Sequence, residues 1–71
     1  MFTLSVAYAD GREQDYMVPA EDLITWILGH SISLAELTPC GRIRVVLASS
    51  PWETMRREAK VGFLRSLGFT G

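Results

Sequence analysis

Apolar and polar side chains alternate along residues 2–8, where every second residue from Phe2 onward is apolar. A period of two residues is typical of a β-strand with one buried face. The dipeptide Asp10-Gly11 then marks a tight turn. Residues 13–18 are therefore expected to return as a second, antiparallel strand.

The side-chain parity of this hairpin indicates the length of its loop. A two-residue loop would turn Tyr16 to the face opposite Leu4, because a slip of one residue moves every side chain of a strand to the other face. A three-residue loop over residues 9–11 pairs Leu4 with Tyr16 and puts Gly11 at the left-handed position that such a loop needs. We predict the three-residue loop.

A first helix is predicted after Pro19, a residue that suits the start of a helix. Glu21 and Asp22 would lie at its positive end. Apolar residues then recur at helical spacing through Leu28, and Gly29 is a natural end point. The helix is short and mostly apolar, so it should be largely buried.

Residues 30–41 carry the pattern of a helix start. Ser33 followed by Glu36 resembles a capping box, which predicts one or two turns of helix over Leu34–Leu37. Pro39 and Gly41 would end this helix.

Residues 42–49 alternate again and predict a third strand. One face would carry Ile43, Val45 and Leu47. The other face would carry Arg42, Arg44, Val46 and Ala48.

A second helix is predicted from Ser50-Pro51-Trp52-Glu53 to about residue 67, because these four residues combine an N-cap serine, an early proline and an acid. Its core stripe would be Met55, Ala59, Phe63 and Leu67. Gly68 would end the helix, and Phe69 would fold back on Leu64.

These elements predict an α+β fold of ββαβα order, with residues 1–71 forming a single domain. A right-handed crossover through the first helix places the third strand beside the first, which makes a three-stranded sheet of order 2-1-3. Both helices would pack on one face. The second and third strands would each leave an open edge that could pair with another strand.

Composition describes a small globular protein without a covalent staple. The chain has 71 residues, 48% of them hydrophobic, and its single Cys40 allows no internal disulfide. No signal peptide and no stretch long enough to span a membrane is present. We read the chain, which starts at Met1, as a complete small protein of the cytoplasm.

Charge is divided along the chain. Residues 1–39 hold six acids and Arg12, a net charge of −5, whereas residues 40–71 hold six bases and two acids, a net charge of +4. The two halves could neutralise each other on folding. Alternatively, one pole could meet an oppositely charged partner.

No residue pattern indicates catalysis, and no cofactor or metal is expected. The glycines form neither a dinucleotide-binding nor a phosphate-binding motif. A dyad of His30 and Cys40 would need the fold to bring them together, since such pairs are recognised by geometry. The acids Glu21 and Asp22 are expected at the start of the first helix. Glu13 and Asp15 are expected on an exposed strand face, and neither pair provides the several convergent oxygens that a hard cation needs. We therefore expect that the protein is not an enzyme.

The candidate contact residues lie in the basic half. They are Trp52, Arg56, Arg57, Lys60 and Arg65 of the second helix, with Arg42 and Arg44 of the third strand. Tryptophan and arginine together are enriched at the centres of protein interfaces. The alternative is that the charges form a solvated helix face and that the tryptophans cap the edge of a thin core.

We therefore expect a non-enzymatic protein-binding module that acts as a stand-alone inhibitor or adaptor. It could do so as a homodimer. Small phage or mobile-element proteins, anti-CRISPR proteins among them, fit that class. The alternative is a nucleic-acid-binding domain that uses the basic C-terminal helix. The sequence pI of about 5.7 argues against that alternative, and no membrane partner is expected.

Overall fold

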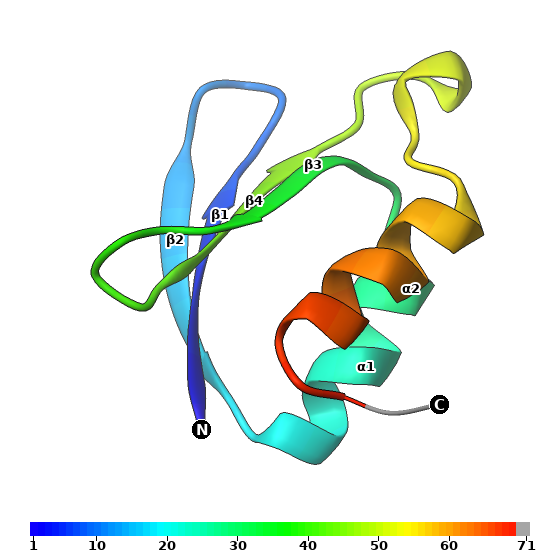
Figure 1. The fold of residues 1–71 in the computed structure, drawn as a ribbon. Coiled ribbons are helices and arrows are strands. Elements are labelled where there is room, and N and C mark those ends of the chain that lie inside the picture. Colours follow the sequence, from blue (N-terminus) through cyan, green and yellow to red (C-terminus); the bar gives the residue numbers. More distant parts are fainter. Residues whose placement is uncertain (70–71) are drawn as a thin grey trace.

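A mixed four-stranded sheet carries two α-helices on one face in the computed structural model, which describes residues 1–69 (Figure 1). The elements are β1 (Phe2–Ala7), β2 (Glu13–Val18), α1 (Ala20–Gly29), β3 (Ile32–Leu37), β4 (Ile43–Leu47), the 3₁₀ helix η1 (Pro51–Glu53) and α2 (Arg57–Ser66). The α+β class and the placement of both helices on one face are confirmed. The last two residues of the expected domain 1–71 lie outside the described part.

The strands are ordered β2-β1-β4-β3. β1 and β4 are parallel neighbours at the centre, and each forms an antiparallel pair with an outer strand. The predicted order 2-1-3 is right for β2, β1 and β4, as expected for a crossover through α1. The prediction of three strands, with residues 42–49 at an edge, is wrong because β3 pairs with the far side of β4.

The β1–β2 hairpin has the predicted register, with Leu4 opposite Tyr16 and Phe2 opposite Val18. The Tyr8 amide donates to the Arg12 carbonyl at 2.8 Å, which closes a three-residue loop. Gly11 has a φ of 92°, a left-handed value that favours glycine. The predicted three-residue loop is therefore confirmed.

The helix predicted over Leu34–Leu37 is wrong, because these residues belong to β3. The Ser33 hydroxyl donates to the Val46 carbonyl on β4 at 3.2 Å instead of capping a helix. The β3–β4 loop repeats the first one, since the Thr38 amide donates to the Arg42 carbonyl at 2.8 Å and Gly41 has a φ of 88°. Pairing along β4 outweighs the local capping pattern.

A β-bulge between Ile32 and Leu34 changes which side chains of β3 face the helices. Ile32 is buried opposite Leu47, but the next pair is Leu34 with Val46, on the uncovered face. Leu34 is therefore 41% exposed. The extra residue moves the side chains that follow it to the other face.

The second helix does not run unbroken from residue 50 to residue 67 as predicted. The chain forms η1, and the Met55 amide then donates to the Ile32 carbonyl at 2.6 Å, which ties this segment to β3. α2 begins only at Arg57.

The core stripe predicted for the second helix is right for Met55, Phe63 and Leu67, which pack against the core, and wrong for Ala59, which is exposed. The buried residues of α2 are Lys60 and Leu64. The end of α2 agrees with the prediction: Gly68 has a φ of 101°, and the Phe69 amide donates to the Leu64 carbonyl at 3.2 Å.

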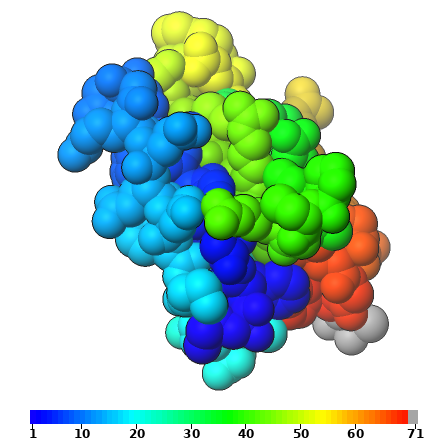
Figure 2. All heavy atoms as spheres, turned by 90° about the vertical axis from the view of Figure 1, so that its left-hand side faces the viewer, coloured from blue at the N-terminus to red at the C-terminus, as the bar shows by residue number. Residues whose placement is uncertain are grey.

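The core lies between the sheet and the helices. Its buried members are Leu4, Val6, Val18, Leu23, Ile27, Ile32, Ile43, Val45 and Leu64. Within residues 1–69 no helix covers the opposite face of the sheet. Figure 2 looks onto this face, with the N-terminal strands in blue beside β3 and β4 in green. Residues on this face and residues on the outside of α2 therefore belong to separate surfaces.

Candidate functional site

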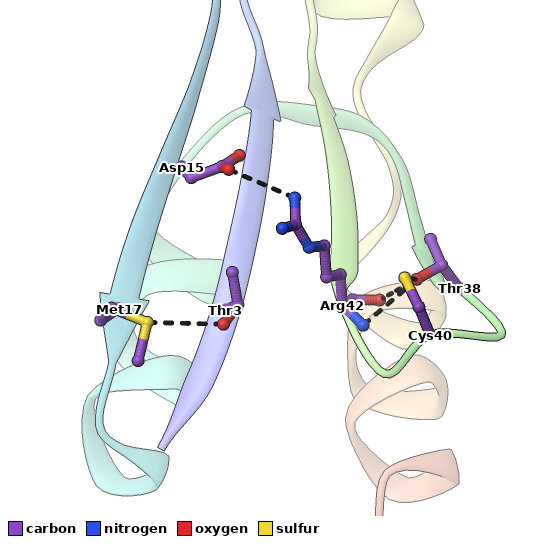
Figure 3. A network of polar contacts seen from close by, with 6 residues as sticks. All are labelled: Thr3, Asp15, Met17, Thr38, Cys40 and Arg42. Carbon is purple, nitrogen blue, oxygen red and sulfur yellow. Dashed lines mark hydrogen bonds and ion pairs between the residues drawn. The ribbon is translucent and has the colours of Figure 1, made fainter.

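Arg42 and Arg44 lie on the open face of the sheet, away from α2. The Arg42 guanidinium lies 3.3 Å from a carboxylate oxygen of Asp15 and reaches across β1 to do so (Figure 3). Arg44 pairs with Glu36 of β3 at 3.2 Å. Both arginines thus meet acids of the N-terminal half, so folding neutralises part of the charge division seen along the chain.

Lys60 was expected on the exposed side of the second helix, and that prediction is wrong. Its side chain is buried, with only 6% of the residue exposed. The ammonium donates to the carbonyl oxygen of His30 at 2.6 Å. His30 follows α1 directly, where helix carbonyls lack partners within the helix and favour a cation. Lys60 therefore joins the two helices instead of facing a partner.

Trp52 is the most exposed large hydrophobic side chain among the described residues, at 85%. Trp52 belongs to η1. η1 lies between β4 and α2 and is the yellow turn in Figure 1. The alternative that Trp52 caps the edge of the core is wrong for this residue. The other tryptophan, Trp26, is half-buried and stacks on His30 with ring centroids 4.1 Å apart.

The backbone that carries Trp52 is held by its neighbour Glu53. One carboxylate oxygen of Glu53 accepts hydrogen bonds from the Ser49 hydroxyl at 2.7 Å and the Ser49 amide at 3.2 Å. These bonds to the charged form lower the pKa of the Glu53 carboxyl. The predicted capping serine, Ser50, makes no side-chain capping bond. The bonds to the Glu53 carboxylate come from Ser49 instead. η1 thus presents Trp52 from a fixed turn.

The remaining candidates, Arg56, Arg57 and Arg65, are exposed and lie on α2 or at its cap. Within residues 1–69 none of the three makes an ion pair. Arg56 and Arg57 stand at the positive end of the helix, where a cation is unfavourable. Arg56 is the N-cap residue and provides no side-chain capping bond. The uncompensated positive charge of the described chain is therefore concentrated on α2.

A groove lies along the outer side of α2 between Arg57 and Arg65. Its outer part has a volume of about 320 Å³ and is lined by Arg57, Glu58, Val61, Gly62 and Arg65. We call this depression, with its extension between the helices, the α2 groove. Gly62 widens it, since a Cβ atom there would meet no other atom within 4 Å.

The inner part of the α2 groove is a hollow of about 70 Å³ that shares Arg57, Val61 and Arg65 with the outer part. Its further walls are Ile24 and Leu28 of α1, with Leu64 and Phe69. This groove was not predicted from the sequence. A glycine inside a helix costs stability, so Gly62 was the one local signal for it.

A larger depression of about 470 Å³ lies under η1 and is lined by Ser31, Ala48, Ser49, Ser50, Pro51 and Thr54. None of these side chains is an acid or a base. The Ser49 hydroxyl does contact Glu53, but a carboxyl with a lowered pKa is a poor base. This depression therefore has no group suited to activating a hydroxyl.

His30 and Cys40 do not form a dyad. β3 separates them, and its six residues span about 20 Å at the usual rise of a strand. The His30 Nδ1 atom lies 2.8 Å from the Trp26 carbonyl oxygen, whereas the Cys40 Sγ atom lies 3.1 Å from the Thr38 hydroxyl (Figure 3). No group of three His, Cys, Asp or Glu side chains placed to hold a metal occurs in residues 1–69.

Neither α1 nor α2, nor any other helix in residues 1–69, has the length and apolar character needed to cross a membrane. No family model, curated protein or solved structure matches the chain.

Proposed function

We propose that this chain is a protein-binding module whose contact surface is formed by Trp52 on η1 and by the exposed arginines of α2. The observation that carries the proposal is the 85% exposure of Trp52. A tryptophan side chain has roughly 150–250 Å² of surface, so its burial at an interface would contribute roughly 4–6 kcal/mol before the costs of association. Tryptophan is also among the residues that contribute most to protein interfaces.

The arginines at the start of α2 support the same surface. Arg56 and Arg57 each cost about 0.3–1 kcal/mol at the positive end of a helix, and no acid among the described residues pairs with them. Residues that lower stability without a structural role are expected where they serve a partner. A partner with negative charge would offset this repulsion and associate faster.

A protein partner fits this surface better than nucleic acid. Arg42 and Arg44 are already paired with acids on the other face of the sheet, and Lys60 is buried. Three exposed arginines remain, which is few for a surface that must neutralise a run of phosphates. A role as an inhibitor or an adaptor is the corresponding hypothesis for the biological effect of such binding.

Site-specific photocrosslinking tests the proposal. A benzophenone amino acid replaces Trp52 in one variant and Met17, which is exposed on the open face of the sheet, in a matched control. Both variants are produced in cells of the native source and irradiated. The proposal expects a discrete protein adduct from position 52 that is weak or absent from position 17.

The crosslinked band identifies the class of partner. Adducts that are equal at both positions, or that disappear on nuclease treatment, would contradict the proposal. The charge-reversed variant Arg56→Glu with the crosslinker at position 52 should form less of the adduct, because the arginine belongs to the same surface.

A further inference from the structure

We infer that the α2 groove binds an extended acidic segment of a partner protein, in which two carboxylates four residues apart flank one apolar side chain. This inference rests on the proposed function, since it names the partner chemistry that the α2 side of the contact surface would accept.

Two arginines lie at the ends of the α2 groove. Arg57 and Arg65 are eight positions apart on α2, which is about 12 Å along the helix axis. Val61 lies midway between them, four residues from each, so the three side chains form one stripe. The described residues provide no carboxylate partner to either arginine. The groove thus has a cation at each end and an apolar residue at its centre.

The space at the centre of the groove is lined mostly by apolar side chains. Beside Val61 the groove deepens between the helices toward Ile24, Leu28 and Leu64. Gly62 leaves the approach open because it has no side chain. An apolar side chain carried by a segment that lies along α2 could enter this space.

The side-chain spacing of an extended chain matches the spacing of the two arginines. Side chains at positions i, i+2 and i+4 of a strand point to the same side, and the outer two are about 13 Å apart. This distance matches the roughly 12 Å between Arg57 and Arg65 along the helix. A segment of the form acid-x-apolar-x-acid therefore places each carboxylate at an arginine and the apolar side chain at Val61. Glu58 also lines the groove at its Arg57 end, so the lining residues together carry a net charge of +1.

The occupant of the groove is a different protein and not a second copy of this chain. The chain's own acids are Asp10, Glu13, Asp15, Glu21, Asp22, Glu36, Glu53 and Glu58, and no two of them are four residues apart. A second copy therefore lacks the required pattern.

The experiment is an NMR titration of the ¹⁵N-labelled full chain with a synthetic peptide. The probe is glutamate-serine-leucine-serine-glutamate with blocked ends, and the matched control peptide has the same composition but adjacent glutamates. The probe should shift the amide signals of Val61, Gly62 and Arg65 with a dissociation constant of about 0.1–1 mM, since exposed ion pairs contribute weakly. The control peptide should bind several-fold more weakly.

Matched variants test the groove itself. The double charge reversal Arg57→Glu/Arg65→Glu should weaken binding by about tenfold or more, whereas Arg12→Glu/Arg42→Glu changes the net charge equally at a distance and should not. Gly62→Phe should block the groove, whereas Ala59→Phe places the same side chain at an exposed position of α2 outside the groove and should retain binding. Unchanged chemical shifts on adding the probe, equal binding of both peptides, or tighter binding of a single-stranded oligonucleotide would overturn the inference.

The NMR titration tests the groove independently of the crosslinking experiment, which tests the proposed function. If position 52 crosslinks to a protein but the probe does not bind, the groove inference fails alone. If the probe binds but position 52 yields no adduct, the Trp52 surface fails and the groove inference stands.

Discussion

The Lys60 ammonium donates a hydrogen bond to the His30 carbonyl oxygen at 2.6 Å, which joins the first turn of α2 to the end of α1. The bond gives a buried cation a partner and gives a helix-end carbonyl a donor. Lys60 therefore belongs to the packing of the two helices, although its charge made it a candidate for partner contact.

Replacing Lys60 by alanine should lower the free energy of unfolding by about 2–3 kcal/mol. The substitution removes a charged hydrogen bond and much of a buried side chain. Urea unfolding followed by circular dichroism measures the loss. The exposed Arg65→Ala is the matched control and should change stability by less than about 0.5 kcal/mol. Equal stability of the two variants would contradict the role assigned to Lys60.

Replacing Arg56 by aspartate should raise the free energy of unfolding by about 0.5–2 kcal/mol. Residue 56 is the N-cap of α2 and has extended backbone angles. The carboxylate of an aspartate there can accept a hydrogen bond from an unpaired helix amide. Thermal unfolding should show a midpoint several degrees higher. Arg65→Asp, at the other end of α2, should lower it. Shifts of the same sign would show that neither the cap nor the helix dipole determines the effect.

Alanine substitutions at two glycines should act in opposite directions. Gly62→Ala should stabilise the fold by about 0.5–1 kcal/mol, because a Cβ atom there has open space and alanine favours a helix. Gly68→Ala should destabilise it by about 1–2 kcal/mol, since residue 68 has a φ of 101°. Denaturant midpoints measure both. A stabilising Gly68→Ala would contradict the left-handed helix end.

The hydrogen bonds from Ser49 to Glu53 should appear in the pH dependence of stability. The pKa of the Glu53 carboxyl is lower in the folded chain than in the unfolded chain. The resulting stabilisation is therefore present above the unfolded pKa of about 4.5 and is lost as the pH falls through the folded pKa. Carboxyl NMR titration should show the low pKa, and Ser49→Ala should move it upward. An ordinary titration of Glu53 in the native chain would refute this.

Cys40 should react faster with iodoacetamide at neutral pH than an unperturbed thiol. The Thr38 hydroxyl at 3.1 Å, followed by the Arg42 backbone, lowers the pKa of the Cys40 thiol, and the side chain is exposed. A lower pKa increases the fraction of reactive thiolate. Thr38→Val should slow alkylation at neutral pH and have little effect in alkali, where the thiol is ionised in both proteins. Equal rates at neutral pH would argue against the hydrogen bond.

The two hairpins show how far local patterns reach. The period of two and Gly11 predicted the register of β1 and β2, because both the strand face and the turn depend on residues close in sequence. The second hairpin has the same loop, and Gly41 is followed by arginine as Gly11 is. β3 was missed because Ser33 and Glu36 also fit a helix start. Only the pairing with β4 decides between the two structures.

The candidate site divides in the same way. The exposed candidates Trp52, Arg56, Arg57 and Arg65 were predicted from the sequence. Lys60 was grouped with them because an unbroken helix from residue 50 was expected. The break at residues 54–56, held by the bond from Met55 to Ile32, lets α2 turn Lys60 toward α1. The α2 groove needs residues of both helices, so no single segment reveals it.

Local sequence patterns were enough to predict the α+β class, the first hairpin, the first helix and the basic character of the C-terminal half, because periodicity, turn residues and charge act over a few neighbouring residues. Long-range packing was needed to make residues 32–37 a strand, to bury Lys60, and to pair Arg42 and Arg44 with acids while leaving the arginines of α2 without such partners among the described residues. These outcomes depend on partners distant in the chain, whose hydrogen bonds and ion pairs exist only once the sheet and helices have packed.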